Sequence, residues 1–386
     1  MKIIIYCQHV LGVGHFFRTL EIARAMQGFE VTLVTGGKKV DAPLPDHVRH
    51  VSLPGLMMDK DFTCLHSVDP EKTVEAVKLE RQDKLLFLIQ KEKPDLFFIE
   101  LYPFGRRAFR FELIPALDFI KDKLKKNCKV VCSLRDILVE KEDRSKYENR
   151  VINALNTWFD AVLVHSDPRL IKLDATFSSL DRINVPLFYT GFVTPLPDQE
   201  KVMHIRHKAE LTGKGRLITV SAGGGNVGAK LLKAAVRAFN QLPQGKDWKF
   251  KVFTGPYMGE EDKNYLHSFA GNTIKVEQFS HDFVSLLAAS DLSISMAGYN
   301  TCMNIVAANV PSLVLPFDQN LEQLSRAKKI AEFAPMIVLE DKDLEVPVFT
   351  SILKKCLEKQ KQTLKINLNI KGALNTRKWI EEHIRN

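Results

Sequence analysis

A histidine stands directly behind a glycine pair near the start of the chain, in Gly12-Val13-Gly14-His15. The apolar run before it predicts a strand, and the pattern after it predicts an amphipathic helix with Arg18 one turn further on. Glycines at such a turn let the backbone approach a ligand closely, and a helix N-terminus favours negative charge. His15 could therefore contact a substrate or take a proton from it. The alternative is that His15 only hydrogen-bonds nearby backbone.

The first loop does not match a dinucleotide site. That fingerprint requires a third glycine three residues after Gly14, where this chain has Phe17. Glu100 is a second candidate for acid–base chemistry, because it follows the apolar run "DLFFI" and a carboxylate there could act as a general base or bind a hydroxyl.

Three further polar loops follow apolar runs in the second half of the chain. Each precedes a helical pattern, and a helix N-terminus favours an anion such as a diphosphate. No Walker lysine follows the glycine run, which disfavours ATP hydrolysis by a P-loop. The alternative for each loop is an ordinary turn or helix cap. The loops are 221–228, with Gly223, Gly224, Gly225 and Asn226; 297–301, with Gly298, Tyr299, Asn300 and Thr301, and Asn304 one turn later; and 318–323, with Glu322 and Gln323.

Arginines alternate with phenylalanines in the segment 102–127. This pattern suits an anionic membrane surface or a lipid-linked acceptor, and a core helix with a charged outer face is the alternative. The residues are Arg106, Arg107 and Arg110, with Phe104, Phe109 and Phe111. Two Asp-x-Asp triplets, 59–61 and 341–343, lie in polar turns, and we expect no metal site at either.

Ten short apolar runs, separated by helical patterns, position these loops. Continuous apolar strands alternating with helices are typical of parallel sheets covered on both faces. Two series of five strands predict an α/β fold of two Rossmann-like, doubly wound domains, in which ligands bind beyond the carboxyl ends of the strands and at a cleft where the domains face each other. The runs are 3–7, 31–35, 95–100, 129–134 and 161–166, then 217–222, 250–255, 274–279, 292–297 and 312–317.

The expected domain boundary follows residue 193. Residues 1–193 form the first predicted domain, and 194–212, rich in proline and charge without periodicity, form a predicted linker. The second predicted domain is 213–365. A final helix is expected within 366–386, with packing back on the first domain as one option.

The composition is that of a globular protein with a large core. The 386 residues are 45% hydrophobic and 26% charged, with a net charge of +9 and a pI of about 9.1, which favours anionic partners. The basic residues are spread out and no nucleic-acid motif occurs, so nucleic acid is not an expected partner.

Six cysteines without a CxxC pair indicate the reducing cytoplasm. An early end of the first apolar run excludes a signal peptide, and no run reaches the length of a membrane span.

Several segments together resemble the GT-B glycosyltransferases, and family 28 most closely, such as the N-acetylglucosaminyltransferase of peptidoglycan synthesis. The resemblance covers nearly the whole chain and is strongest over 274–327. A less characterised branch of predicted glycosyltransferases is also similar. The segments are "GVGHFFRTLEIARAM", "SAGGGNVGAKLL", "VEQFSHDFVSLLAASDLSISMAGYNTCMNIVAANVPSLVLPF" and "EQLSRA", with "PFGRRAFRFELIPAL", "VCSLRDIL" and "FYTGFV" for the branch.

The resemblance implies an acceptor-binding first domain and a second domain that binds a nucleotide-sugar donor, commonly a UDP-sugar. By motif position, the base would lie against Phe279 and Ser280, the diphosphate against 298–301, and the sugar hydroxyls against Glu322 and Gln323. Gly12, Gly14 and His15 would face the donor. Asn304 stands where the family usually has a glutamate that binds the ribose hydroxyls, so a weaker charge-assisted contact is expected there.

The resemblance implies sugar transfer to a hydroxyl with inversion, His15 or Glu100 as the base, and neither metal nor cofactor. The expected acceptor is lipid-linked or a cell-surface glycan precursor, and the expected location is cytoplasmic, at the inner face of the membrane. Two alternatives remain open. The Gly-x-Gly-His-x-x-Arg loop is also similar to one in sugar hydrolases of this architecture, which favours a nucleotide-sugar hydrolase or epimerase. Asn304 favours a non-catalytic nucleotide-sugar binder.

Overall fold

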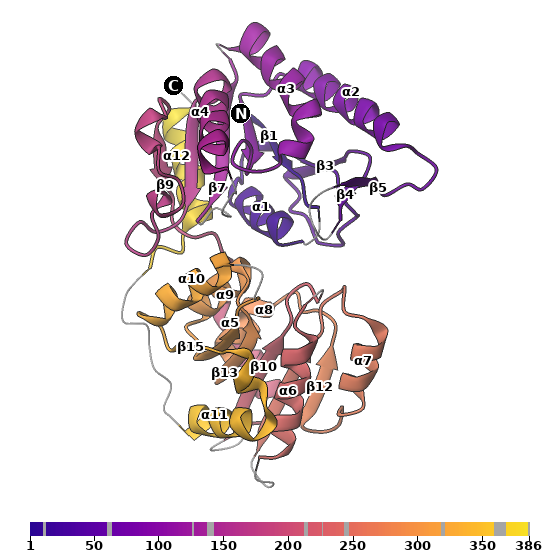
Figure 1. Ribbon diagram of the computed structural model, residues 1–386, viewed down its shortest axis with the longest axis vertical. Helices are drawn as coiled ribbons and strands as arrows, with labels where there is room; N and C mark the ends of the chain where they lie inside the picture. The colour runs from indigo at the N-terminus through magenta and orange to yellow at the C-terminus, as the bar shows by residue number, and fades with distance from the viewer. Residues whose placement is uncertain are drawn as a thin grey trace. The chain divides into compact units, whose positions relative to one another are not determined.

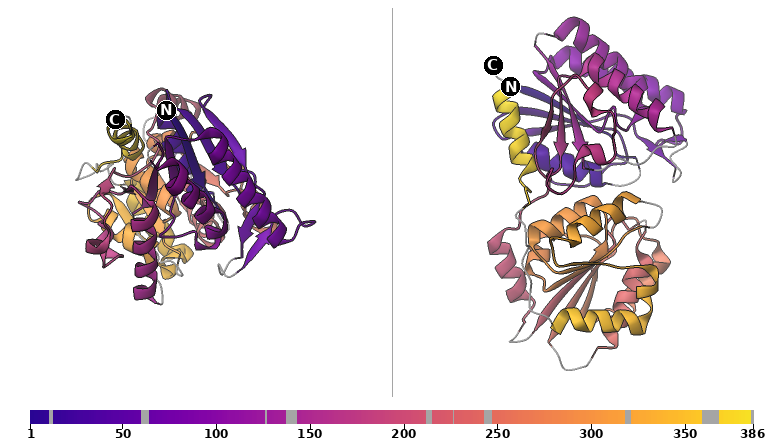
Figure 2. Two further views of the ribbon diagram at one scale, coloured as in Figure 1. Left: turned by 90° about the horizontal axis from the view of Figure 1, so that it is seen from above. Right: turned by 60° about the vertical axis from the view of Figure 1, so that its left-hand side comes forward.

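The computed structural model describes residues 1–10, 13–59, 64–125, 127–136, 143–211, 215–225, 227–242, 247–317, 321–358 and 368–384. The chain divides into two compact units (Figures 1 and 2). The first unit is Met1–Val193 with Leu368–Asn386, and the second is Thr194–Asn367.

The described part of the first unit contains a seven-stranded parallel sheet in the order β3-β2-β1-β6-β7-β8-β9. An antiparallel hairpin of β4 and β5 adjoins it. The strands are β1 (Lys2–Cys7), β2 (Glu30–Thr35), β3 (Val48–Ser52), β4 (Leu56–Met58), β5 (Leu65–Ser67), β6 (Leu96–Glu100), β7 (Lys129–Arg135), β8 (Ala161–His165) and β9 (Leu187–Tyr189). The helices are α1 (Gly14–Ala25), α2 (Val74–Glu92), α3 (Arg110–Phe119), α4 (Arg144–Trp158) and α12 (Gly372–His383), with short turns at η1 (Arg107–Phe109), η2 (Ile120–Leu124), η3 (Leu173–Ala175) and η4 (Leu180–Arg182).

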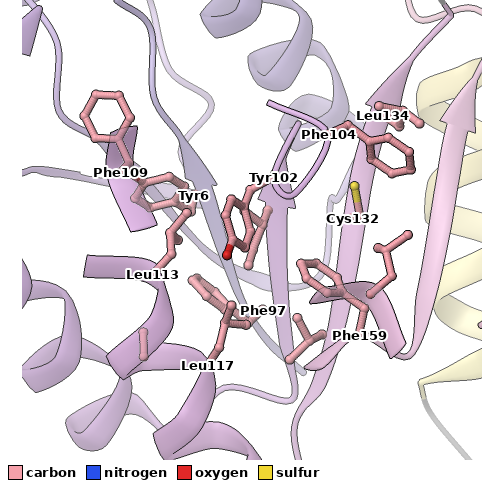
Figure 3. Close-up of a cluster of buried hydrophobic side chains, with 14 of the residues drawn as sticks. Tyr6, Phe97, Tyr102, Phe104, Phe109, Leu113, Leu117, Cys132, Leu134 and Phe159 are labelled. Atoms are coloured by element: carbon pink, nitrogen blue, oxygen red, sulfur yellow. The ribbon is translucent and has the colours of Figure 1, made fainter. Parts of the chain in front are cut away.

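Both faces of this sheet are buried, which is why its central strands are apolar throughout. Along β1, Ile4 and Tyr6 point into one core cluster, whereas Ile3, Ile5 and Cys7 point into another. The first cluster includes side chains of α2, α3 and α4, and Figure 3 shows Leu113 and Leu117 of α3 within it. The second cluster includes side chains of α1 and α12.

The C-terminal helix α12 belongs to the first unit, although it follows the whole of the second unit in sequence (Figure 1). Trp379 and Ile380 are buried in the cluster shared with α1, and Arg377 donates a hydrogen bond to the Ala25 carbonyl at 3.3 Å. Leu374 of the same helix is 53% exposed. The chain order alone therefore does not define the units.

A buried ionic network joins β1, α2 and α3. The side chain of Arg81 is fully buried, and its Nε and Nη2 donate to the two carboxylate oxygens of Glu112 at 2.7 and 2.5 Å. Arg81 also donates to the Gly36 carbonyl, the Pro54 carbonyl and Gln8 Oε1 at 2.7–2.8 Å. The Tyr6 hydroxyl donates to the same carboxylate. All five guanidinium N–H groups thus have partners, which buried charges require.

The described part of the second unit contains a six-stranded parallel sheet in the order β12-β11-β10-β13-β14-β15. Its strands are β10 (Arg216–Ser221), β11 (Trp248–Phe253), β12 (Ile274–Glu277), β13 (Leu292–Met296), β14 (Ser312–Leu315) and β15 (Met336–Val338). Its helices are α5 (Gln199–Lys208), α6 (Ala229–Asn240), α7 (Glu260–His267), α8 (Phe283–Ala289), α9 (Tyr299–Ala308), α10 (Leu321–Ala331) and α11 (Val346–Glu358), with a short turn at η5 (Asp341–Leu344).

The segment expected to be an irregular linker contains a helix. Asp198 caps α5 by accepting from two backbone N–H groups, and Val202 and Ile205 pack against the small core cluster of the second unit. Lys201 forms an ion pair with Asp282 at 2.5 Å. Residues 199–208 of the predicted linker thus form a helix, which was not predicted because its apolar face has only two residues and shows no clear periodicity.

No helix within the described ranges is long and apolar enough to cross a lipid bilayer.

Candidate active site

His15 and Glu100 lie together at the centre of the first sheet. β1 and β6 are neighbouring strands at the point where the strand order reverses. Glu100 is the last residue of β6, and His15 is the second residue of α1, directly after β1. The distance from His15 Nδ1 to Glu100 Oε1 is 2.6 Å. The reversal point of an open α/β sheet is the usual place for a ligand site.

Two arginines surround the Glu100 carboxylate. Arg18 Nη2 donates to Oε1 at 2.5 Å, and Arg106 Nε lies 3.6 Å from Oε2. Both arginine side chains are nearly buried, at 2% and 8% exposed. Burial acts to raise the pKa of Glu100, but His15, Arg106 and Arg18 together outweigh it and hold the pKa below its usual range. Glu100 is thus an ionised carboxylate.

His15 is held as a neutral imidazole. Burial is the largest influence and lowers the pKa of His15 to about 3, with Glu100 opposing it and Arg106 and Arg18 adding to it. The N-terminal position on α1 acts in the same direction. With Glu100 ionised, the 2.6 Å contact assigns the ring proton to Nδ1, which donates to Oε1. Nε2 makes no hydrogen bond within the described part of the chain, and the side chain is 22% exposed.

The first glycine loop is only partly described. Gly12 lies outside the described residues, and Gly14 begins α1. Asn226 of the second glycine loop also lies outside them.

The remaining glycines of the second loop have different structural roles. Gly223 and Gly225 have positive φ, at +65° and +91°. A Cβ on Gly225 would lie 2.6 Å from the Thr254 carbonyl oxygen, so the close approach of two backbones requires this glycine. Gly224 has only Tyr257 nearby, at 3.8 Å. This geometry favours the turn interpretation for Gly225, whereas Gly223 and Gly224 both have open space beside them.

The loop at 298–301 forms the N-terminus of α9. Gly298 is the N-cap residue, and the first turn holds Tyr299, Asn300 and Thr301 with no acidic side chain. Tyr299 is buried, with the Arg326 guanidinium carbon 5.2 Å from its ring centroid. A helix N-terminus without acidic residues, beside a buried cation, is an electropositive site that suits a diphosphate.

Asn304 contacts the start of the second unit. Its Oδ1 accepts a hydrogen bond from the Thr194 hydroxyl at 2.9 Å. One of the two lone pairs of that oxygen is therefore already used, which leaves less acceptor capacity for a ribose hydroxyl than the sequence suggested.

The other expected donor residues follow strands β12 and β14. Phe279 is 46% exposed, and its ring lies edge-on to His281 with 5.1 Å between centroids. Ser280 stands between them in the chain.

Glu322 is buried in the first turn of α10. Gln323 Oε1 accepts from the Phe317 N–H at 3.1 Å, so this amide joins α10 to the end of β14. The loops after β10, β13 and β14 come from neighbouring strands, so the topology brings these three together.

The Asp-x-Asp triplets have structural partners where they are described. Asp343 accepts from the Glu340 N–H at 2.8 Å, and Asp341 forms an ion pair with Lys230 at 2.9 Å. Asp61 lies outside the described residues.

The segment around Arg106 differs from the expected membrane-binding pattern. Phe104 and Phe109 are buried in the first core cluster (Figure 3), and Phe111 packs against it. The phenylalanines therefore pack in the core, as the alternative interpretation of this segment expected, while Arg107 and Arg110 remain exposed. The approach of Arg106 to Glu100 was not predicted, because its left-handed backbone (φ +58°) leaves no pattern in the sequence.

His165, the last residue of β8, is a fully buried histidine at the same edge of the sheet. Its Nε2 lies 2.8 Å from Ser133 Oγ and its Nδ1 lies 2.8 Å from Thr190 Oγ1. Burial, followed by Arg18, lowers the pKa of His165 to about 3. It therefore stays neutral in the folded protein.

This neutral histidine predicts acid sensitivity of the fold. Unfolded, His165 binds a proton below its ordinary pKa of about 6.5. Between pH 6.5 and 3 the unfolded chain binds the extra proton, so the free energy of unfolding falls as pH falls, by up to about 1.4 kcal/mol per pH unit. We expect His165→Gln to reduce this slope in urea titrations at several pH values. His66→Gln, at an exposed position, is the matched control, and an unchanged slope in His165→Gln would contradict the assignment.

Parts of the chain are similar to known glycosyltransferases. Residues 219–382 match the glycosyltransferase family 28 C-terminal domain. Two similar curated proteins are UDP-N-acetylglucosamine–N-acetylmuramyl-(pentapeptide) pyrophosphoryl-undecaprenol N-acetylglucosamine transferases. The Prochlorococcus marinus protein is 24% identical over 213 residues, which are 51% of this chain and 56% of the relative. The Aquifex aeolicus protein is 30% identical over 154 residues, 38% and 43% of the two chains.

Solved structures are similar over almost the whole chain. MurG of Acinetobacter baumannii has a TM-score of 0.55 at 15% identity and covers 98% of this chain and 95% of its own. The UDP-GlcNAc 2-epimerase of Methanocaldococcus jannaschii has a TM-score of 0.58 at 11% identity, covering 99% and 100%.

The two doubly wound units thus define a GT-B fold, and the predicted fold class is confirmed. Within that fold, the similarity to the family 28 glycosyltransferases lies in the C-terminal domain that residues 219–382 match. The chain spans about half the length of the curated relatives it matches.

Proposed function

We propose that this protein is a glycosyltransferase that moves a sugar from a nucleotide-sugar donor, a UDP-sugar first, to an acceptor hydroxyl. The observation that carries the proposal is the 2.6 Å contact between His15 Nδ1 and the ionised Glu100, with Nε2 unengaged. The family and the relatives named as UDP-N-acetylglucosamine-dependent transferases support it.

In the proposed reaction, His15 Nε2 takes the proton of the acceptor hydroxyl as its oxygen attacks the anomeric carbon. The bond between that carbon and the donor phosphate breaks, and the electron pair leaves with the nucleoside diphosphate. The Glu100 carboxylate stabilises the imidazolium that forms. A single displacement inverts the anomeric carbon.

The leaving diphosphate is proposed to bind at the N-terminus of α9. Its backbone N–H groups and helix dipole stabilise the developing negative charge, so a metal ion is not required by this proposal. We expect Gly224, Phe279, Ser280, Glu322 and Gln323 to complete the donor site.

Asn304 offers a test of the donor site. An ionised carboxylate accepts hydroxyl hydrogen bonds about twice as strongly as a neutral group. We expect Asn304→Glu to tighten UDP binding about tenfold, an energy of about 1.4 kcal/mol, in isothermal titration calorimetry. Asn304→Gln, which lengthens the side chain without adding charge, should give no gain. Equal affinities in all three proteins would remove Asn304 from the ribose site.

The direct experiment incubates the protein with a panel of nucleotide sugars, with and without candidate acceptors. Acceptor-dependent release of nucleotide supports the proposal. Release of free sugar in water alone, at a rate that no acceptor changes, would indicate a hydrolase. An isomerised donor would indicate an epimerase. Binding without turnover would indicate a non-catalytic nucleotide-sugar binder.

We further propose that the acceptor is lipid-linked or a cell-surface glycan precursor and that transfer occurs at the cytoplasmic face of the membrane. The pyrophosphoryl-undecaprenol acceptor in the names of the relatives supports this part of the proposal.

A further inference from the structure

A large cavity of about 1330 Å³ lies within the first unit. Its walls come from the β4–β5 hairpin, α2, the segment between β6 and α3, and α4; α2 and α3 lie side by side in Figure 1. The cavity exceeds the usual volume of a small-molecule site, which is roughly 300–1,000 Å³. It is therefore large enough for a whole substrate.

Positive charge dominates the lining of this cavity. Six cationic side chains line it against two acidic ones, Glu75 and Asp143. Asp143 is already engaged, because its carboxylate caps α4 by accepting from the Lys146 N–H at 2.9 Å. The six cations, which we call the cavity cations, are Lys78, Arg106, Arg107, Arg110, Lys146 and Arg150.

Five of the cavity cations have no carboxylate partner in the described part of the chain. Only Arg106 contacts one, the 3.6 Å approach to Glu100. The other five form no ion pair or side-chain hydrogen bond among the described residues, and Lys78 and Arg150 instead lie over the rings of Phe111 and Tyr147. Two other arginines of this unit show the contrast, since Arg81 and Arg169 each form an ion pair at 2.5 Å.

Three of the arginines lie close enough for their charges to interact. Arg107, Arg110 and Arg150 also line an adjoining cavity of about 440 Å³ whose other walls include Tyr102 and Trp158. Burial first, and then Arg107 and Arg110, lower the pKa of Arg150. The guanidinium groups therefore repel one another without a counter-charge among the described residues.

Arg106 connects the cavity to the histidine–carboxylate pair. Its side chain is 8% exposed and lines the cavity, while its Nε lies 3.6 Å from Glu100. Its Nη2 is buried without a hydrogen-bond partner among the described residues. A buried donor without a partner is costly and indicates an anionic ligand that the chain itself does not supply.

We propose that the cavity binds a phosphate or diphosphate group of the acceptor, held by Arg107, Arg110 and Arg150 with Arg106 facing the side of Glu100. This inference rests on the proposed function, because only a transferase has an acceptor. A single carboxylate satisfies one guanidinium, whereas a phosphate has several oxygens and up to two charges and can bridge several. The cavity thus selects acceptors by charge, in a unit separate from the one that binds the donor diphosphate.

The test measures binding of inorganic pyrophosphate by calorimetry with saturating UDP present. The cavity variant is Arg107→Gln/Arg110→Gln/Arg150→Gln. The matched control is Lys121→Gln/Lys123→Gln/Lys125→Gln, which removes the same charge from exposed positions just beyond α3. We expect about 100-fold weaker binding by the cavity variant, since each charge-assisted bond contributes strongly, and no more than about twofold change in the control.

A second arm uses phosphatidylcholine vesicles with and without phosphatidic acid. Vesicle binding that requires phosphatidic acid and is lost in the cavity variant assigns the phosphate to a lipid acceptor. Pyrophosphate binding without vesicle binding assigns it to a soluble acceptor. Equal affinities of the cavity variant and the control for a probe that the parent binds, or binding of neither probe by the parent, overturn the proposal.

The outcome is independent of sugar transfer. Neither probe is a sugar donor, and neither measurement requires turnover. Loss of anion binding in the cavity variant of a protein that releases no nucleotide would leave the cavity assigned and the transferase proposal rejected. Unchanged anion binding in an active transferase would reject the cavity alone.

Discussion

Replacing His15 with alanine is expected to lower the turnover number for nucleotide release by about 10²–10⁴-fold, the usual contribution of a general base. The substitution removes Nε2, the proposed proton acceptor, and leaves the Glu100 carboxylate ionised between Arg18 and Arg106. The affinity for UDP should change by less than about twofold, because the proposed nucleotide contacts lie in the second unit. Steady-state kinetics and calorimetry measure the two effects separately.

Glu100→Gln tests the role of the Glu100 carboxylate beside His15 separately from proton transfer by His15 itself. The amide removes the charge that stabilises the imidazolium, so a reduced turnover number with unchanged UDP affinity is expected. His66→Ala, at an exposed position, controls for the loss of a histidine. Near-normal turnover in His15→Ala would return His15 to the alternative role of a residue that hydrogen-bonds at the start of α1.

The second large effect is expected on stability. Arg81→Leu should lower the free energy of unfolding by about 3–5 kcal/mol, the usual cost of removing one partner of a buried ion pair. The change leaves the Glu112 carboxylate fully buried without its guanidinium, and the carbonyls of Gly36 and Pro54 lose their donor. Urea unfolding followed by circular dichroism measures the loss.

The double variant Arg81→Leu/Glu112→Leu shows whether the loss comes from an unpaired charge. Without a buried carboxylate, it should be more stable than Arg81→Leu alone. Lys84→Leu lies on the exposed face of the same helix and should change the free energy by no more than about 0.5 kcal/mol. A loss under 1 kcal/mol in Arg81→Leu would mean that the network does not hold α2 and α3 to β1.

Much of the fold follows from the sequence, because strands buried on both faces must be apolar throughout. All ten predicted runs correspond to strands within a few residues. The edge strand β3 was missed because its sequence "VRHVS" is half polar, and β9 and β15 because they have only three residues each. The sequence pattern is weakest at sheet edges, where one side of the strand is not enclosed.

The individual residues of the site could be predicted from the sequence, but the contacts between them could not. His15 and Glu100 each follow an apolar strand, which placed both at the carboxyl edge of a sheet. Their contact requires β1 and β6 to be neighbours, and strand order is a long-range property that neither segment contains. Arg81 was missed for the same reason, since its burial depends on Glu112 thirty-one residues away. The donor roles of the residues after β10, β12, β13 and β14 stay predictions.

The most direct test of the central claim is a product balance from one reaction mixture of donor, acceptor and protein. Nucleotide, free sugar and glycosylated acceptor are quantified together by chromatography and mass spectrometry. We expect one glycosylated acceptor for each nucleotide released, with little free sugar, and loss of both products in His15→Ala. Free sugar equal to the nucleotide released, or no nucleotide from any donor, would contradict it.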